Sequence, residues 1–361
     1  MAISRLEHVW LRNGLKGSSC AYGTFLAISA VMEGQLLHKS VVSTGLLIVG
    51  TALTIGACAR PLHRPLQAPA ADLSAELWND PIDLGTRDLF HGPGGTALVP
   101  RAVTYTFVAR KTSGTNPGYD VRDPEGRTWS VKLGEESQSE VTVSRILWAL
   151  GFHQPPTYYV ERWQLAGSDT REQPAGRFRT ELPGHEAVAE WSWYDNPFIG
   201  SRPFAALVTI NLLVKNWDLK TPNNKVYLVT NADGRRERRY VVRDLGGSLG
   251  NAKQPRFLSW FPFMRHKQGS KNNLEDFEAQ GFVKAVGDES VDFDYRGIDP
   301  ALLDVVTAAD LRWTCDLLSR LSEQQWLDAF RAGGYAKEES SRYLRKIQDN
   351  ISRARTQNLR N

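Results

Sequence analysis

The feature that most constrains the fold is an almost entirely apolar segment, residues 203–217, that runs directly into a polar loop. The segment reads PFAALVTINLLVKNW, and the chain continues as DLKTPNNKVY. A helix that is apolar on all sides is buried inside a protein. A bilayer span needs about 20 apolar residues, so this segment is too short to be one. We therefore predict a buried helix that holds the polar loop in a fixed position.

Two groups of polar residues follow this segment. The first is the loop itself, with Asp218, Lys220 and Asn223. The second is Asp244, in YVVRDLGGSLG, directly after an apolar strand over 240–242. Residues 225–230 and 239–242 are typical of strands and 231–234 of a turn, so we predict that an extended hairpin connects Asn223 with Asp244.

Upstream of the buried helix, the sequence predicts a strand followed by a helix. Residues 129–133 read WSVKL, which alternates like a strand and contains Lys132. Apolar residues recur at helical spacing over 137–150, and Gly151 follows as a stop signal. Glu140 lies near the start of this helix and is our candidate partner for Lys132, with Glu136 as the second candidate.

A glycine-bearing loop is predicted before the Lys132 strand. Residues 103–110 are typical of a strand, and the following loop over 111–118 contains Gly114 and Gly118. A shorter strand and an Asp-Pro-Glu-Gly turn lead on to Lys132. The two glycines are spaced GxxxG, which alone indicates an ordinary hairpin turn. Lys132, downstream of this loop, is the only feature that favours the other interpretation, a loop that covers phosphate groups.

Taken together and in this order, these elements resemble the atypical branch of the protein-kinase fold, closest to HipA-type kinases and their secreted kinase-like relatives. The resemblance covers residues 103 to about 361. It implies an α+β, two-lobed fold, with a small β-rich N-lobe containing one helix over 103–196 and a larger helical C-lobe over 197–361. Taken singly, each motif residue also has an ordinary role in a turn or at a strand end.

The resemblance also implies cofactors and residue roles. ATP and Mg²⁺, or Mn²⁺, would lie between the lobes, where Gly114 and Gly118 cover the nucleotide. Lys132 would hold its phosphates and Glu140 would orient that lysine. Asp218 would orient the acceptor hydroxyl and Lys220 would stabilise charge. Asn223 and Asp244 would bind the metal.

Three departures from typical protein kinases leave other functions open. Asn216-Trp217 stands where His-Arg is usual, so we expect no activation-loop switch that reads a phosphorylated residue. Leu245 replaces the phenylalanine of Asp-Phe-Gly, and no Ala-Pro-Glu follows. A pseudokinase that acts as a binding module, or a nucleotidyl transferase that transfers AMP, remains an alternative. The acceptor, whether protein, sugar or lipid, is not determined by the sequence.

The N-terminal residues predict export. Residues 41–57 are uncharged and mostly apolar, and Ile55-Gly56-Ala57-Cys58 is typical of a bacterial lipoprotein signal peptide. We predict a leader over 1–57 with a possible true start at Met32, lipidation of Cys58, and a linker and extension over 58–102. An uncleaved membrane anchor is the alternative. Either would place the catalytic unit in the bacterial cell envelope, facing the periplasm or the exterior, on an inner or outer membrane.

Composition and charge favour one catalytic unit and no nucleic-acid partner. The chain is 41% hydrophobic and 23% charged with a net charge of +4, as in ordinary soluble proteins. A cluster of arginines over 235–239 could attract an acidic substrate or anionic lipid, although a solvated turn is favoured. The aromatic segment 257–267 could dock a substrate, but packing against the C-lobe is favoured. The oligomeric state is not determined by the sequence.

Overall fold

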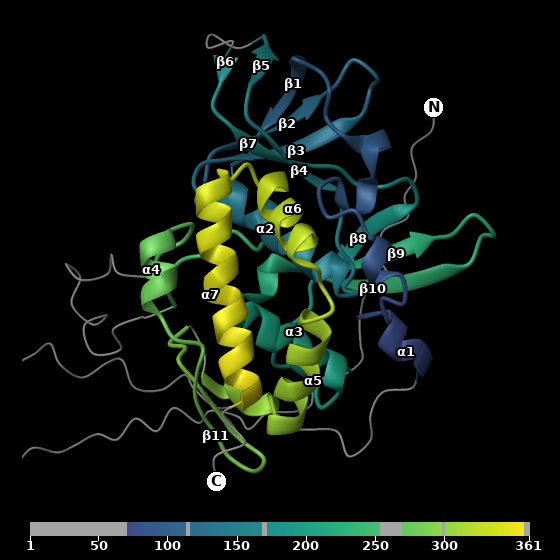
Figure 1. Ribbon diagram of the computed structural model, residues 1–361. Coiled ribbons are helices and arrows are strands. Elements are labelled where there is room, and N and C mark those ends of the chain that lie inside the picture. Colours follow the sequence, from purple (N-terminus) through teal and green to yellow (C-terminus); the bar gives the residue numbers. More distant parts are fainter. Residues whose placement is uncertain (1–70, 113–115, 168–171, 253–268, 298–299, 357–361) are drawn as a thin grey trace, which may run out of the picture. The chain divides into compact units, whose positions relative to one another are not determined.

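The computed structural model describes residues 71–112, 116–167, 172–252, 269–297 and 300–356 (Figure 1). Four predictions of the sequence therefore lie outside the described residues: the leader with Met32, lipidation at Cys58, the glycine at Gly114, and the aromatic segment 257–267. Within the described residues, no helix combines the length and the apolar character that a membrane crossing requires.

The N-terminal part is built on a seven-stranded sheet. Its order is β4-β7-β3-β2-β1-β5-β6, and every pairing is antiparallel except that of β1 with β5. The strands are β1 (Thr104–Arg110), β2 (Gly118–Arg122), β3 (Thr128–Leu133), β4 (Thr157–Val160), β5 (Trp163–Ala166), β6 (Glu172–Gln173) and β7 (Gly176–Arg179). Alternate side chains of these strands, including Val121, Trp129 and Phe178, form a separate apolar core.

One long helix accompanies this sheet. Helix α2 (Glu136–Ala149) follows β3 and lies against β3, β4 and β7. It ends at Leu150 and Gly151, where Gly151 has a φ of 97° and approaches the side chain of Trp78. A side chain at that position would collide with Trp78 and with the carbonyl of Asn79, so the glycine permits the close approach.

A second sheet joins the two parts of the chain. Its order is β10-β9-β8, with β8 (His185–Ala189), β9 (Asn224–Thr230) and β10 (Arg236–Val242). The hairpin predicted between the two polar groups is confirmed. Strands β9 and β10 pair along their whole lengths, from Thr230 opposite Arg236 to Asn224 opposite Val242. Strand β8 lies in the predicted N-lobe range but pairs with this hairpin and not with the seven-stranded sheet.

The C-terminal part is mainly helical. Helix α3 (Arg202–Leu213) is buried along its length after its first turn. The other elements are α4 (Leu274–Ala279), α5 (Ala308–Leu318), α6 (Glu323–Ala332), α7 (Lys337–Thr356), and a small hairpin of β11 (Val283–Val286) and β12 (Val291–Phe293). Figure 1 shows α3 and α5 towards the opposite end of this unit from β1, β2 and β3, while α7 runs along the helical part. The α+β architecture is thus confirmed, with a β-rich N-terminal part and a helical C-terminal part.

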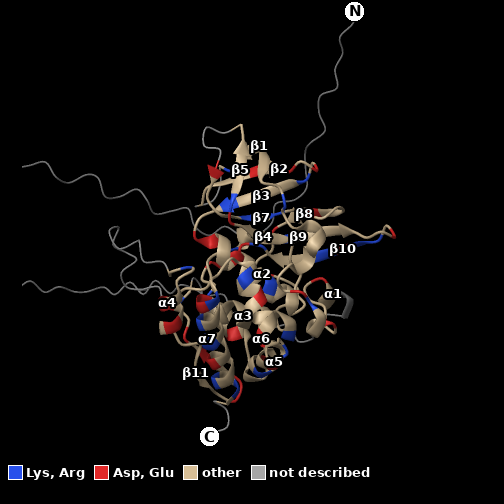
Figure 2. Ribbon diagram, turned by 45° about the horizontal axis from the view of Figure 1, so that its top comes forward, with Lys and Arg blue, Asp and Glu red and all other residues tan. Residues whose placement is uncertain are grey.

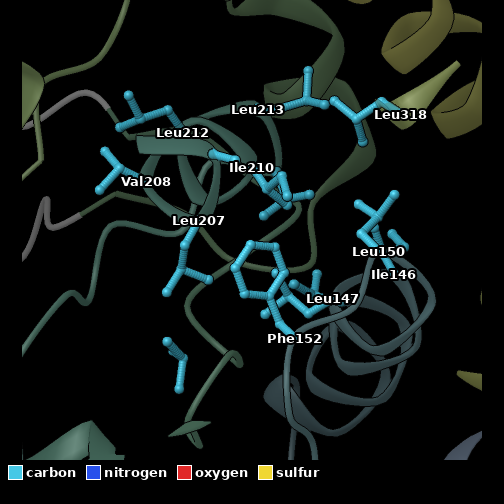
Figure 3. Packing of buried hydrophobic residues seen from close by; sticks show 14 of the residues in the cluster. Ile146, Leu147, Leu150, Phe152, Leu207, Val208, Ile210, Leu212, Leu213 and Leu318 are labelled. Carbon is cyan, nitrogen blue, oxygen red and sulfur yellow. The ribbon is translucent and has the colours of Figure 1, made fainter. Parts of the chain in front are cut away.

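The main apolar core connects α2 to α3. Ile146, Leu147 and Leu150 at the end of α2 belong to the same buried cluster as Leu207 and Ile210 of α3 (Figure 3). Because α2 carries Glu140 and α3 leads to Asp218, one core fixes the two elements that present these side chains. Interiors pack at crystal-like density, so the relative position of these two helices is well defined.

The N-terminal extension also packs on this core. Leu77, Leu84 and Leu89 are buried in the main cluster, from a segment with the short helix α1 (Ala71–Ala75) and the 3₁₀ turns η1 (Leu84–Thr86), η2 (Gly92–Gly94) and η3 (Thr96–Leu98). Residues 71–102, the described part of the predicted linker and extension, therefore belong to the folded unit. The domain boundaries themselves stay predictions.

Candidate active site

Lys132 lies at the centre of the candidate site. Its position on β3 directs the ammonium group towards the start of α2 and the end of β10. Nζ lies 2.6 Å from Oε2 of Glu136, 3.0 Å from Oε2 of Glu140 and 2.8 Å from Oδ1 of Asp244. Burial lowers the pKa of Lys132, but the three carboxylates outweigh it and raise the pKa above its ordinary value. The lysine is therefore held in its charged form.

The structure brings both candidate glutamates to Lys132. Glu140 has a side chain that is 1% exposed and lies near the centre of the fold. Glu136 is closer to the lysine and also forms an ion pair with Lys271, at 2.5 Å. Burial raises the pKa of Glu136, but Lys132 and Lys271 lower it by a larger amount. The pKa of Glu136 is therefore below its ordinary value. The two residues occupy successive turns of α2, so both face the same side of the helix.

Two buried arginines complete the surroundings of Glu140. Its Oε1 lies 2.8 Å from Nε of Arg177 and 3.2 Å from Nη1 of Arg179. Arg179 also donates to the carbonyl of Arg243, at 2.9 Å. The sequence analysis missed both residues. The Arg-Phe-Arg alternation of β7 was the available signal, because alternate residues of a strand share one face.

Asp244 is held between Lys132 and the backbone. Its Oδ1 accepts from Lys132 and from the amide of Gly246, at 3.3 Å. Burial raises the pKa of Asp244, but Lys132 lowers it by more, to about 2. The carboxylate is therefore ionised at neutral pH. Within the described residues its other oxygen, Oδ2, has no hydrogen-bond partner.

The hairpin places Asn223 beside the backbone of Asp244. The amides of Arg243 and Asp244 both donate to the carbonyl of Asn223, at 2.8 and 3.2 Å. The side-chain amide of Asn223 donates to the backbone carbonyl of Asp218 at 2.8 Å and to Oδ2 of Asp218 at 3.1 Å. Since the NH₂ group is used in these bonds, the side-chain oxygen of Asn223 is directed away from Asp218 and remains a possible ligand.

The loop between α3 and Asn223 is fixed from its buried side. Helix α3 ends at Leu213, and Lys215 follows with a φ of 60°. Asn216 is buried, and its Oδ1 accepts from the amide of Asp218 at 3.2 Å. Asp218 also pairs through Oδ1 with Lys220, at 2.6 Å. Asn216-Trp217 stands where His-Arg is usual. The role of Asn216 there is structural, because its side chain holds the backbone of Asp218.

Two glycines allow the Asp-Leu-Gly segment to approach the site closely. A Cβ on Gly246 would lie 2.5 Å from Cβ of Glu136, and one on Gly247 would lie 3.0 Å from Cβ of Asp218. The hydroxyl of Ser139 on α2 donates to the carbonyl of Gly246, at 3.0 Å. Leu245, in place of the usual phenylalanine, is fully buried in the main core. This segment therefore connects α2 with the Asp218 loop.

A groove of about 550 Å³ opens next to these residues. Its lining carries more positive than negative charge, and Figure 2 shows Lys and Arg on β7 and along β10, two of the strands nearby. The lining residues are Arg110, Lys111, Thr112, Asp120, Ser130, Arg179, Pro222, Asn223, Lys225, Arg243 and Asp244. Such a surface suits a ligand with several negative charges.

Lys111 is a further residue that the sequence analysis missed. It follows β1 in the loop predicted to cover phosphates, and its ammonium donates to the hydroxyl of Ser130. Burial is the main cause that lowers the pKa of Lys111. The positive charges of Arg177 and Arg179 add to this decrease, so the pKa is about 8. Gly118 starts β2 opposite Lys132, and a Cβ there would lie 2.5 Å from the carbonyl of Val131. The glycine thus permits close pairing beside the groove.

The arginine cluster over 235–239 is largely paired. Arg235 contacts Asp233, Arg238 contacts Glu76, and Arg239 contacts Glu237. These pairs lie on the β9–β10 hairpin and at its contact with the N-terminal extension. They agree with the interpretation of the cluster as a solvated turn.

The donor set fits a Mg²⁺ ion that is also held by phosphate groups. Within the described residues, no three His, Cys, Asp or Glu side chains are grouped to hold a metal ion by themselves. Asn223, directly before β9, and Asp244, just after β10, offer oxygen atoms at the same end of the hairpin. Mg²⁺ is commonly bound by one or two carboxylates together with substrate phosphates and water. A site of this kind would be complete only with a nucleotide in the groove.

Comparisons with known proteins gave similarities only among solved structures. No family model matches the chain, and no curated protein matches it. A proinflammatory kinase of Helicobacter pylori, CtkA, is 11% identical with a TM-score of 0.41, over 72% of this chain and 98% of that one. A Golgi casein kinase with Mn/ADP bound is 8% identical with a TM-score of 0.35, over 72% and 74%. Another structure of the Golgi casein kinase is 9% identical with a TM-score of 0.34, over 72% of each.

The described unit is similar in fold to these kinase structures. Lys132 lies on a central strand, Glu140 on the next helix contacts it, and Asp244 reaches Lys132 from the C-terminal part. None of the three structures is described as a HipA-type kinase, and that finer resemblance stays a prediction.

Proposed function

We propose that this protein is an ATP- and Mg²⁺-dependent phosphotransferase that transfers the γ-phosphate to a hydroxyl group on a protein, sugar or lipid. We further propose that it is exported and anchored by a lipid on Cys58 in a bacterial cell envelope. The observation that carries the enzymatic part is the ion-paired cluster of Lys132, Glu140 and Asp244. Phosphoryl transfer needs little covalent chemistry from the protein, so positioning and charge are the main contributions.

Lys132 and Glu140 would position the nucleotide. Glu140 holds the ammonium of Lys132 from the buried side, and Arg177 and Arg179 hold Glu140 in turn. A nucleotide phosphate would compete with Asp244 and Glu136 for the same ammonium group. The positive charge of the groove would offset the charges of the phosphates.

Asp218 and Lys220 would act on the acceptor. The carboxylate of Asp218 is partly exposed and is held by the side-chain amide of Asn223, so it is placed to accept a hydrogen bond from an incoming hydroxyl. Lys220 is half exposed and lies on the solvent side of Asp218, where its charge would act on the transferring group. Asn223 and Asp244 would hold Mg²⁺, which supplies charge neutralisation at the phosphates when bound.

Nucleotide binding is the first test. The thermal unfolding of the full chain is measured with and without MgATP, for the wild type, for Asp244→Ala and for the control Asp233→Ala. Asp233 lies at the exposed tip of the β9–β10 hairpin. At a hundredfold the Kd, a ligand stabilises by about 2.7 kcal/mol, which is about 4 °C for a unit of roughly 300 residues.

The expected result is a shift that depends on Mg²⁺, persists in the control and disappears in Asp244→Ala. No shift in the wild type at millimolar MgATP would contradict the nucleotide site and favour a pseudokinase. Mass spectrometry of acceptor mixtures then separates the remaining alternatives, because a phosphate adduct supports phosphotransfer and an AMP adduct supports a nucleotidyl transferase.

Export is tested separately. Cys58→Ser should move the protein from the membrane fraction to the soluble fraction of expressing bacteria, because the thioether that carries the lipid cannot form. Cys315→Ser is the matched control, since Cys315 is buried in the main core. Unchanged partitioning of Cys58→Ser would contradict the lipid anchor.

A further inference from the structure

A second cavity, of about 410 Å³, lies apart from the groove at the active site and shares no lining residue with it. Helix α2, strand β4 and the end of α6 form its walls together with the N-terminal extension. Its charged lining residues are Arg145, Arg162, Arg331 and Glu161, with His91 beside them. Ligand pockets of proteins commonly have volumes of about 300–1,000 Å³, so this cavity could hold a small molecule.

Arg145 is the unusual residue of this cavity. It is fully buried, and within the described residues none of its three guanidinium nitrogens has a hydrogen-bond partner. Its guanidinium carbon lies over the ring of Tyr158, 5.2 Å from the ring centroid. Gly92 makes room for the head group, because a Cβ there would lie 2.3 Å from Nη1 of Arg145. The part of the chain that the structure describes thus gives the arginine space but no acceptor.

An unpaired buried guanidinium is costly. Transfer of a charged group from water into a protein interior costs several kcal/mol unless an opposite charge and hydrogen bonds compensate it. Burial lowers the pKa of Arg145 to about 10, and the charges of Tyr158 and Asp88 act against that decrease. The group therefore remains charged at neutral pH and requires an anion as a partner.

The acidic groups around the cavity do not supply this partner. Asp88 is bound to His91, with 2.6 Å between Oδ2 and Nδ1. Glu161 is exposed on the turn after β4. On the exposed rim, Arg162 adds a positive charge, and so does Arg331, which also contacts Asp328 and the ring of Phe90.

We propose that this cavity binds a small phosphate-bearing anion, with Arg145 at its buried wall and Arg162 and Arg331 at its exposed rim. Guanidinium groups match the oxygens of phosphate with paired hydrogen bonds. The excess of positive charge favours a doubly charged anion over a single carboxylate. Apolar lining residues such as Val99 and Val160 would accommodate the organic part of a phosphate ester.

The probe for this site is inorganic phosphate. Its binding to the full chain is measured by calorimetry at pH 7.5, at constant ionic strength maintained with chloride. We expect saturable binding by the wild type. For Arg145→Met the Kd should be at least tenfold higher, because a hydrogen bond to a charged group contributes about 1.5–3 kcal/mol. Arg353→Gln is the matched control on α7, where the arginine is exposed and pairs with Asp349.

Two further variants keep the test decisive if Arg145→Met does not fold. The double variant Arg162→Gln with Arg331→Gln changes only exposed side chains and should weaken phosphate binding severalfold. Lys132→Met removes the ammonium group that would hold phosphate at the active site, so the binding that depends on Arg145 should persist in this variant. Absence of saturable binding, or equal affinity in wild type and the rim variant, would overturn the proposal. Loss of binding in Lys132→Met alone would assign phosphate to the active-site groove and overturn it as well.

Thermal unfolding without phosphate gives an independent check. Because Arg145 lacks a partner, Arg145→Met should unfold at the same temperature as the wild type or at a higher one, as when other buried charges are replaced by apolar groups of similar volume. Phosphate should then raise the unfolding temperature of the wild type and not of the variant. A lower unfolding temperature for the variant, with an unchanged response to phosphate, would show that Arg145 has only a structural role.

Discussion

Replacement of Glu140 by glutamine removes one buried negative charge without a change of volume. In the wild type this carboxylate contacts Lys132 through Oε2 and Arg177 and Arg179 through Oε1. Both arginines are buried, and Arg177 is 3% exposed. In Glu140→Gln the positive charges of Lys132, Arg177 and Arg179 would remain in the interior, but the negative charge that all three contact would be absent.

The expected loss in the free energy of unfolding follows from the burial of these charges. Removal of one partner of a buried ion pair costs about 3–5 kcal/mol, because the remaining charge is left uncompensated. Most proteins are stable by only about 5–15 kcal/mol, so this is a large fraction of the total. With a urea m-value of about 3 kcal/mol/M, typical of larger domains, the unfolding midpoint should fall by about 1–1.7 M.

Glu136→Gln is the matched control. Glu136 contacts the same ammonium group of Lys132 and lies one turn away on α2. In this variant Lys132 keeps Glu140 and Asp244, and the side chain of Lys271 can reach solvent. The cost should therefore be about 1 kcal/mol or less, as for partly exposed ion pairs.

Urea unfolding of the two variants, followed by tryptophan fluorescence, compares these costs. Glu140→Gln should be less stable than Glu136→Gln by at least about 2 kcal/mol. Equal stability of the two variants would refute the conclusion that Glu140 compensates Arg177 and Arg179. It would also remove the reason to prefer Glu140 over Glu136 as the residue that orients Lys132.

Three further predictions concern the active site. Asp218→Ala should lower turnover by about 10²–10⁴-fold with little change in MgATP affinity, because Asp218 acts on the acceptor; equal turnover would exclude that role. Lys111 loses its proton in the folded protein as the pH rises through about 8, below its ordinary pKa of 10.5. ATP affinity should therefore fall between about pH 7 and 9, and Lys111→Arg, which stays charged, should abolish this fall. Gly246→Ala would force Glu136 away from Lys132 and should cost about 1–3 kcal/mol in stability, whereas Gly234→Ala, at the open tip of the hairpin, should leave Glu136 in place.

The elements of the fold that carry the site were predictable because each depends on local sequence. The alternation around Lys132 predicts a strand, the spacing before Gly151 predicts a helix, and both are present as β3 and α2. The turn at 231–234 and its flanking strands predict the hairpin that brings Asn223 to Asp244. Periodicity and turn chemistry act over a few residues, so one sequence is enough to read them.

The conformation at the end of the helix before Asp218 depends on more than hydrophobicity. The apolar segment over 203–217 predicts a buried helix, and α3 ends within this segment at Leu213. The left-handed conformation of Lys215 and the buried hydrogen bonds of Asn216 turn the chain there. The side-chain bond is made to Asn211 of α3 itself, whereas the hydroxyl of Tyr295, from a distant part of the chain, donates to the carbonyl of Asn216. Hydrophobicity alone does not reveal these bonds.

The sequence by itself determined the order and the residue types of the site: a lysine on a strand, glutamates on the next helix, and an aspartate and an asparagine on a hairpin. The tertiary structure alone decided which charges meet. It placed Glu136 closer to Lys132 than Glu140, buried Arg177 and Arg179 against Glu140, and left Arg145 without an acceptor among the described residues. Charges interact through space over a few ångströms, and residues from distant parts of the chain come that close only when the core is packed.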